Sequence, residues 1–106
     1  MSMVSKKKSR ALQTLEAATG GPLTLGKLIQ SIRLGEEMTQ PEFAKILGIS
    51  KSHLNDIEKG RKLISPDRAD RFAKVLKYSE ERFVALSLQD IVNQAGLRFY
   101  VNLRVA

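Results

Sequence analysis

Side chains able to hydrogen-bond the edges of nucleic-acid bases are concentrated in residues 51–56. Lys51 can donate to O6 and N7 of guanine, Asn55 can pair with N6 and N7 of adenine, and Ser52 can donate or accept. Asp56 could accept from the amino group of cytosine, but a carboxylate is repelled by phosphates. An internal ion pair or a charge on the helix surface explains Asp56 at least as well.

Catalytic chemistry finds little support in the residue types present. The chain has no cysteine and one histidine, His53, too few groups for a zinc site, a cysteine nucleophile or a catalytic triad. His53 could contact a phosphate, although a lone histidine on a helix surface more often has no decisive role. We therefore expect no enzyme activity, no catalytic or metal-binding residues and no cofactor. The lack of cysteine also fits a cytoplasmic location.

Positive charge gathers in two parts of a chain whose net charge is +7. Residues 1–10 hold four basic residues and no acid, and residues 59–77 hold seven basic residues and two acids. Two basic zones in a small chain favour a polyanionic partner, with a solvated helix face as the alternative. For the basic residues of 68–77 the solvated face is the better interpretation.

Hydrophobic spacing and capping signals predict a chain of helices behind the basic arm of residues 1–10. Thr39 and Glu42 form a capping-box pattern with Pro41 in the first turn, and Ser50, Ser65 and Ser79 are further N-caps. No apolar run approaches the roughly 18–20 residues of a membrane span. The expected helices cover residues 11–18, 25–34, 39–47, 50–60, 65–76 and 79–96.

Two of these helices form a tight pair over Gln40 to Lys59. Gly48 supplies a left-handed exit from the first, and the small Ala44 lies where the two would cross. Their packed face would let the second helix project into a DNA groove. The residues expected to face inward are Phe43, Leu47, Ile49, Leu54 and Ile57.

The C-terminal residues change to a period of two. The apolar side chains that alternate with polar ones are Leu97, Phe99, Val101, Leu103 and Val105. This pattern predicts a strand with one buried face. No other segment of the chain predicts a strand, so we expect this one to pair with a second copy or with another protein.

The stretch from about Leu25 to Leu76 resembles the Cro and phage-repressor type of helix-turn-helix, the XRE-type regulators. The residues that carry the resemblance at their family spacing are Arg33, Gln40, Ala44, Gly48, Leu54, Ile57 and Glu58. The resemblance implies an all-α fold, a five-helix lambda-repressor-like DNA-binding domain, here with an N-terminal helix or arm and a C-terminal β-strand tail. The implied units are 1–22, the basic arm and short helix; 23–78, the DNA-binding domain; and 79–106, a helix and strand for dimerisation or partner binding.

The same resemblance implies roles for individual residues. Arg33 and Glu58 match a buried ion pair, and Gln40 matches a residue that contacts a phosphate. Lys51, Ser52 and Asp56 match positions that reach base edges, with Ser50 and Asn55 beside them. The backbone-contacting loop corresponds to Lys59, Arg61 and Lys62.

Several functions fit these features. We expect a homodimer that binds double-stranded DNA at a palindromic operator and represses transcription, including that of its own gene. The arrangement of an N-terminal extension, a DNA-binding domain and a terminal strand also resembles antitoxins of the host-inhibition-of-growth type, which neutralise an RNA-cleaving toxin. The alternatives are a plain repressor of phage or restriction-control type and an interaction module that has lost DNA binding.

Overall fold

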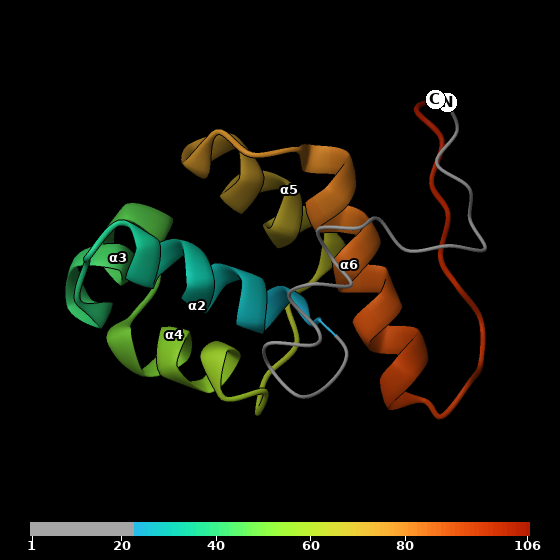
Figure 1. Ribbon diagram of the computed structural model, residues 1–106, viewed down its shortest axis with the longest axis horizontal. Coiled ribbons are helices and arrows are strands. Elements are labelled where there is room, and N and C mark those ends of the chain that lie inside the picture. Colours follow the sequence, from blue (N-terminus) through green and yellow to red (C-terminus); the bar gives the residue numbers. More distant parts are fainter. Residues whose placement is uncertain (1–22) are drawn as a thin grey trace.

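The computed structural model describes residues 23–106, and this part of the chain is folded into five helices (Figure 1). The helices are α2 (Leu25–Gly35), α3 (Gln40–Leu47), α4 (Lys51–Glu58), α5 (Pro66–Leu76) and α6 (Glu80–Gln94). They confirm the all-helical prediction for residues 23–94, with boundaries within about two residues of those expected. The basic arm and the predicted helix at 11–18 lie outside the described residues.

Each helix begins at a hydroxyl side chain that accepts a hydrogen bond from a backbone amide of the first turn. At α3 the predicted capping box is complete, because Thr39 Oγ1 accepts from the Glu42 amide and Glu42 accepts from the Thr39 amide. Ser50 caps α4 through the His53 amide. These local bonds satisfy amides that have no partner within the helix, which explains why the sequence locates the helix starts so closely.

The turn between α3 and α4 depends on Gly48, which has a φ of 74°. This left-handed conformation is costly for residues with a side chain. It lets the Ile49 amide donate to the Ala44 carbonyl at 3.0 Å, a bond that closes the C-terminal end of α3. The predicted glycine turn is confirmed, and it sets the direction in which α4 leaves.

The helices enclose one hydrophobic core. In Figure 1, α2 crosses the centre of the molecule, with α4 on one side of it and α6 near its N-terminal end. Phe43, Leu54 and Ile57 are fully buried and join the helix-turn-helix pair to this core, and Ile49 is partly buried against it. Packing of its inner face against the core therefore fixes the position of α4 and leaves its opposite face exposed.

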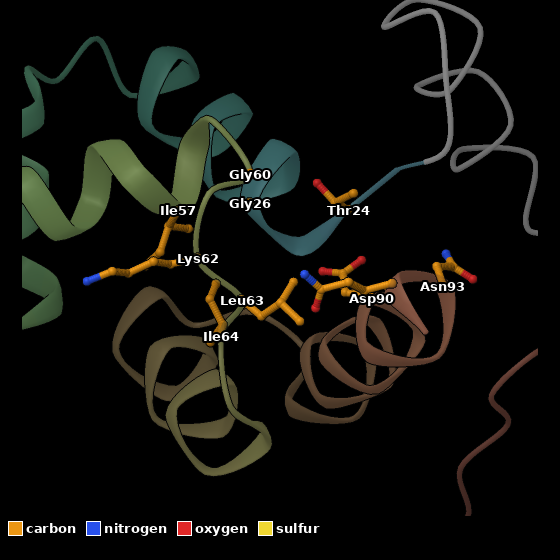
Figure 2. A pocket seen from close by; sticks show the side chains of 10 residues that line it. Thr24, Gly26, Ile57, Gly60, Lys62, Leu63, Ile64, Asp90 and Asn93 are labelled. Carbon is orange, nitrogen blue, oxygen red and sulfur yellow. The ribbon is translucent and has the colours of Figure 1, made fainter. Parts of the chain in front are cut away.

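A buried carboxylate joins α2 to α6 at the edge of this core. Asp90 Oδ2 accepts a hydrogen bond from the Leu25 amide at 3.1 Å, whereas Asp90 Oδ1 has no hydrogen-bond partner. The side chain lines a cavity between the start of α2, the loop after α4 and the end of α6 (Figure 2). Burial raises the pKa of Asp90 to about 6, because a carboxylate loses hydration there.

The predicted C-terminal strand is wrong. Residues 97–106 form no strand, and among residues 23–106 no segment offers them a sheet edge. The tail instead turns at the end of α6 and runs back beside that helix (Figure 1). There the Gln89 side chain donates to the Phe99 carbonyl at 2.8 Å and accepts from the Val101 amide at 2.7 Å.

The physical reason for this error is that a strand needs a second strand, whereas an alternating pattern describes only one chain segment. A single glutamine side chain supplies a donor and an acceptor to the tail. The apolar side chains are left without a continuous cover. Leu97, Phe99 and Val105 are exposed, and Val101 and Leu103 are half-buried.

Candidate nucleic-acid interface

The two sides of α4 have opposite environments. Lys51 and Ser52 are exposed in its first turn, and Asn55 and Asp56 are half-buried one turn further on. Leu54 is completely buried on the other side. The four residues predicted to contact bases therefore share the outer part of one short helix.

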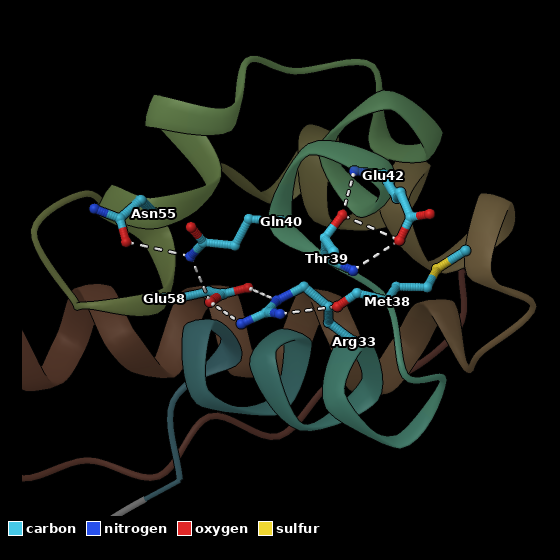
Figure 3. Close-up of polar contacts among 7 residues, drawn as sticks. All are labelled: Arg33, Met38, Thr39, Gln40, Glu42, Asn55 and Glu58. Carbon is cyan, nitrogen blue, oxygen red and sulfur yellow. Dashed lines mark hydrogen bonds and ion pairs between the residues drawn. The ribbon is translucent and has the colours of Figure 1, made fainter.

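A buried ion pair anchors the C-terminal end of α4 to α2. Arg33 Nε donates to Glu58 Oε2 at 2.7 Å, and Arg33 Nη2 donates to Glu58 Oε1 at 3.0 Å. The Glu58 side chain is 1% exposed, and the bonds to this carboxylate raise the pKa of Arg33. Arg33 Nη1 also donates to the Met38 carbonyl at 2.9 Å, so the pair ties together α2, the α2–α3 turn and α4 (Figure 3).

Gln40 lies on top of this ion pair. Its Nε2 atom donates to Glu58 Oε1 at 3.0 Å and to Asn55 Oδ1 at 3.2 Å. The amide nitrogen thus points into the protein, toward Glu58 and Asn55 (Figure 3). The sequence predicted a phosphate contact for Gln40; in the described structure its amide group also links the first residue of α3 to α4.

The carboxylate of Asp56 is paired within the chain. Arg61 Nε donates to Asp56 Oδ1 at 2.9 Å, and the backbone amides of Arg61 and Lys62 donate to the Asp56 carbonyl. The negative charge of Asp56, unexpected on a helix predicted to contact DNA, therefore helps to position the basic loop formed by Lys59, Arg61 and Lys62. An internal ion pair was the alternative explanation for Asp56 from its sequence.

Exposed basic side chains adjoin the outer face of α4. Lys51 is exposed at its N-terminal end, and Lys59, Arg61 and Lys62 are exposed directly after it. Ser50 is also exposed, and its Oγ accepts the capping bond from the His53 amide. A surface with this charge attracts phosphates, and its hydroxyl and ammonium groups are donors suited to phosphate oxygens.

The sequence interpretation missed a contact between α4 and α5. Arg68 Nη1 lies 3.3 Å from His53 Nε2 and 3.4 Å from Nδ1, and both side chains are half-buried. Burial, followed by the positive charge of Arg68, lowers the pKa of His53. Arg68 thus differs from the solvated outer-face residue expected. The only sequence signal was its place in the first turn after Ser65, and helix periodicity does not identify a partner.

The fold and this surface define a class of protein, and comparison with known families agrees. The helix-turn-helix family profile HTH_3 matches residues 29–83, more than half of the chain. The chain belongs to this family, a class of DNA-binding transcriptional regulators, which confirms the resemblance stated from the sequence.

A phage protein is similar over much of the same region. The "ImmF control region 10 kDa protein" of Bacillus phage phi105 is 40% identical over 67 residues, covering 57% of this chain and 74% of that protein. No solved structure matches the chain. Within residues 23–106, no helix has the length and apolar character needed to cross a membrane.

Proposed function

We propose that this protein is a sequence-specific repressor that binds a DNA operator through the outer face of α4. The observation that carries the proposal is the arrangement of α4 itself. Its outer side presents Lys51 and Ser52 beside an exposed basic loop, and its inner side is locked by Leu54 and the Arg33–Glu58 pair. A helix held in this way can enter the major groove without losing its position in the fold.

The proposed contacts divide into two kinds. Lys51, Ser52 and Asn55 contact base edges, where donors and acceptors distinguish one base pair from another. Phosphate contacts fix the register of the protein on DNA. They come from Ser50, Lys59, Arg61 and Lys62, with Gln40 as a further candidate through its backbone amide, because its side-chain nitrogen donates to Glu58 and Asn55. Asp56 acts indirectly, through its ion pair with Arg61.

Repression follows if the operator overlaps a promoter, because a bound dimer then excludes the polymerase. Two copies related by two-fold symmetry would place their α4 helices about 34 Å apart, in successive major grooves. The similarity to a protein described as belonging to a phage control region supports the repressor of phage-control type. The antitoxin interpretation relied on an arrangement of an N-terminal extension, a DNA-binding domain and a terminal strand, and the described residues form no such strand.

Binding to operator and random DNA separates these functions. The experiment uses fluorescence anisotropy with the DNA upstream of the protein's own gene and with a scrambled duplex, at several salt concentrations. We expect a preference of about a thousandfold with a steep salt dependence. Equal, weak binding to both duplexes would contradict autoregulation, and no binding to any duplex would favour an interaction module.

Lys51 provides the sharpest single-residue test. If it donates to a guanine, Lys51→Gln should weaken operator binding by about 1–3 kcal/mol and have much less effect on random DNA. Arg82→Gln is the matched control, because Arg82 is an exposed basic residue in the first turn of α6, a helix that lies apart from α4 (Figure 1). An equal loss on both duplexes would identify Lys51 as a phosphate contact.

A further inference from the structure

A chain of four polar side chains connects the core to the outer face of α4. It runs from Arg33 on α2 to Glu58 at the end of α4, then to Gln40 at the start of α3, and ends at Asn55 (Figure 3). The three links have donor–acceptor distances of 3.0, 3.0 and 3.2 Å. Because each group in the chain restricts the next, the orientation of Asn55 follows from the buried charge.

The first constraint comes from the chemistry of Glu58. A carboxylate paired with a guanidinium offers only acceptors, and Glu58 accepts from Arg33 through both of its oxygen atoms. The amide group of Gln40 must therefore direct its NH2 toward Glu58 Oε1, since the reverse orientation would place two oxygen atoms against each other. The Glu58 side chain is almost completely buried, which makes such a repulsion costly.

The second constraint passes this orientation to Asn55. Gln40 Nε2 has two hydrogens, and while one is donated to Glu58 the other is donated to Asn55 Oδ1. With its oxygen used in this way, Asn55 directs Nδ2 away from Gln40 (Figure 3). The end of the chain is thus a donor on the outer part of the helix.

We propose that Asn55 contacts a base through its outward-directed amide nitrogen and selects guanine over adenine at one operator position. The inference rests on the proposed function, because it requires α4 to lie in the major groove. It differs from the sequence-based expectation of an adenine contact. Pairing with N6 and N7 of adenine needs both the amide oxygen and the amide nitrogen of asparagine on the edge of the base, and here the oxygen is directed toward Gln40 (Figure 3).

The base edges explain the direction of the preference. Guanine presents two adjacent acceptors in the major groove, N7 and O6, which suit an NH2 group. Adenine presents N7 beside an amino group, and this second donor opposes the donor of Asn55. To accept from the adenine amino group, Asn55 would have to turn its oxygen from Gln40 toward the base (Figure 3).

Selection from a random double-stranded DNA library, followed by sequencing, measures this preference directly. The wild-type chain should enrich sites with guanine favoured over adenine by about tenfold at one position of each half-site. Asn55→Ala should lose the preference at that position and keep the others. Asn55→Asp keeps the acceptor for Gln40 but presents an acceptor outward, so guanine should become disfavoured at the same position.

Gln40→Met tests the link itself. Methionine fills a similar volume without a donor, so Asn55 becomes free to rotate and the guanine preference should fall at the same position. That change should vanish in the Asn55→Ala background, whereas loss of a phosphate contact would weaken binding to all sequences equally. Circular dichroism melting of each variant checks that it is folded before selection.

Each contrary result has a distinct meaning. Adenine at the position that Asn55→Ala relaxes, or no position that it relaxes, would overturn the role of Asn55 and leave the repressor proposal standing. A Gln40→Met change that persists without Asn55 would also overturn it. If the wild-type chain enriched no sequence at all, both the proposed function and this inference would fail.

Discussion

At the scale of single residues, the Arg33–Glu58 pair shows how a charge can be structural beside the proposed DNA-binding surface. The Arg33 and Glu58 side chains are 11% and 1% exposed, so neither is well placed to meet DNA directly. Arg33 also donates to the Met38 carbonyl, and Glu58 also accepts from Gln40, so both members of the pair have a further partner. A buried pair of this kind contributes most clearly when one partner is removed.

Arg33→Met should lower the free energy of unfolding by about 3–5 kcal/mol, because it leaves the Glu58 carboxylate buried without its countercharge. Urea denaturation followed by circular dichroism measures the change. The double variant Arg33→Met with Glu58→Leu should recover much of the loss, since it removes both charges. Normal melting of Arg33→Met would show that the pair does not stabilise the fold.

Asp90 gives the protein a pH-dependent stability. The pKa of its folded carboxyl, about 6, lies above the ordinary value of 3.8, so the folded chain holds this proton more tightly than the unfolded chain. The stabilisation is complete below about pH 4 and is lost as the pH rises to about 6, a change of up to about 3 kcal/mol. Groups such as Glu42, whose pKa is lowered by hydrogen bonds from Thr39, act in the opposite direction.

The contribution of Asp90 is therefore measured as the difference in the free energy of unfolding between a variant without this carboxyl and the wild-type chain. We expect the free energy of unfolding of Asp90→Asn, relative to the wild-type chain, to rise between pH 4 and pH 6 and then level off. Urea titrations at half-unit pH intervals provide this comparison. Parallel pH profiles for the two proteins would mean that the Asp90 carboxyl titrates normally.

At the scale of helices, the close approach of α2 and α4 depends on Gly26. A Cβ atom at this position would overlap the Ile57 carbonyl oxygen, which belongs to the backbone of α4 and cannot move aside easily. The glycine is buried in the first turn of α2, near the cap formed by Thr24. The absence of a side chain here allows α4 to pack directly on α2.

Gly26→Ala should destabilise the fold by about 1–3 kcal/mol, because the two helices must separate to admit the methyl group. Gly35→Ala at the other end of α2 is the control, since a Cβ atom there meets no neighbour. That change should be neutral or stabilising by up to about 1 kcal/mol. Thermal unfolding distinguishes the two variants, and equal effects would contradict the packing explanation.

At the scale of the whole molecule, the apolar tail is the largest feature without a place in the core. Phe99, Tyr100 and Val105 are 67%, 64% and 84% exposed, and Ile91 on α6 is 42% exposed. Exposed apolar groups in one segment favour association, and a repressor that reads two half-sites needs a second copy. We propose that the tail and α6 contribute to the dimer without forming a strand within the chain.

Deletion of residues 97–106 should convert the proposed dimer to a monomer, because it removes these apolar side chains. Sedimentation velocity over a range of concentrations measures the change, and Gln89→Ala tests whether anchoring the tail matters. The truncated chain should bind a single half-site with unchanged preference but bind the full operator far more weakly. A truncated chain that remains dimeric would place the interface on another surface.

The amino-acid sequence by itself determined the helices and the motif. Caps such as Thr39 and Ser50, the glycine at position 48 and the spacing of residues such as Leu54 and Ile57 act over a few residues, so they are visible in one chain. The same local spacing identified the helix-turn-helix family. The residues expected to contact bases were identified from their positions on one short helix.

Only the tertiary structure decided how distant polar groups share their hydrogen bonds. Gln40 meets Glu58 and Asn55 across 18 and 15 positions of the chain, and Asp90 meets Leu25 across 65. The tail showed the same limit, because an alternating pattern cannot supply the second strand that a sheet requires. Partners brought together by folding have no local signature, and here they determine which atom Asn55 presents outward.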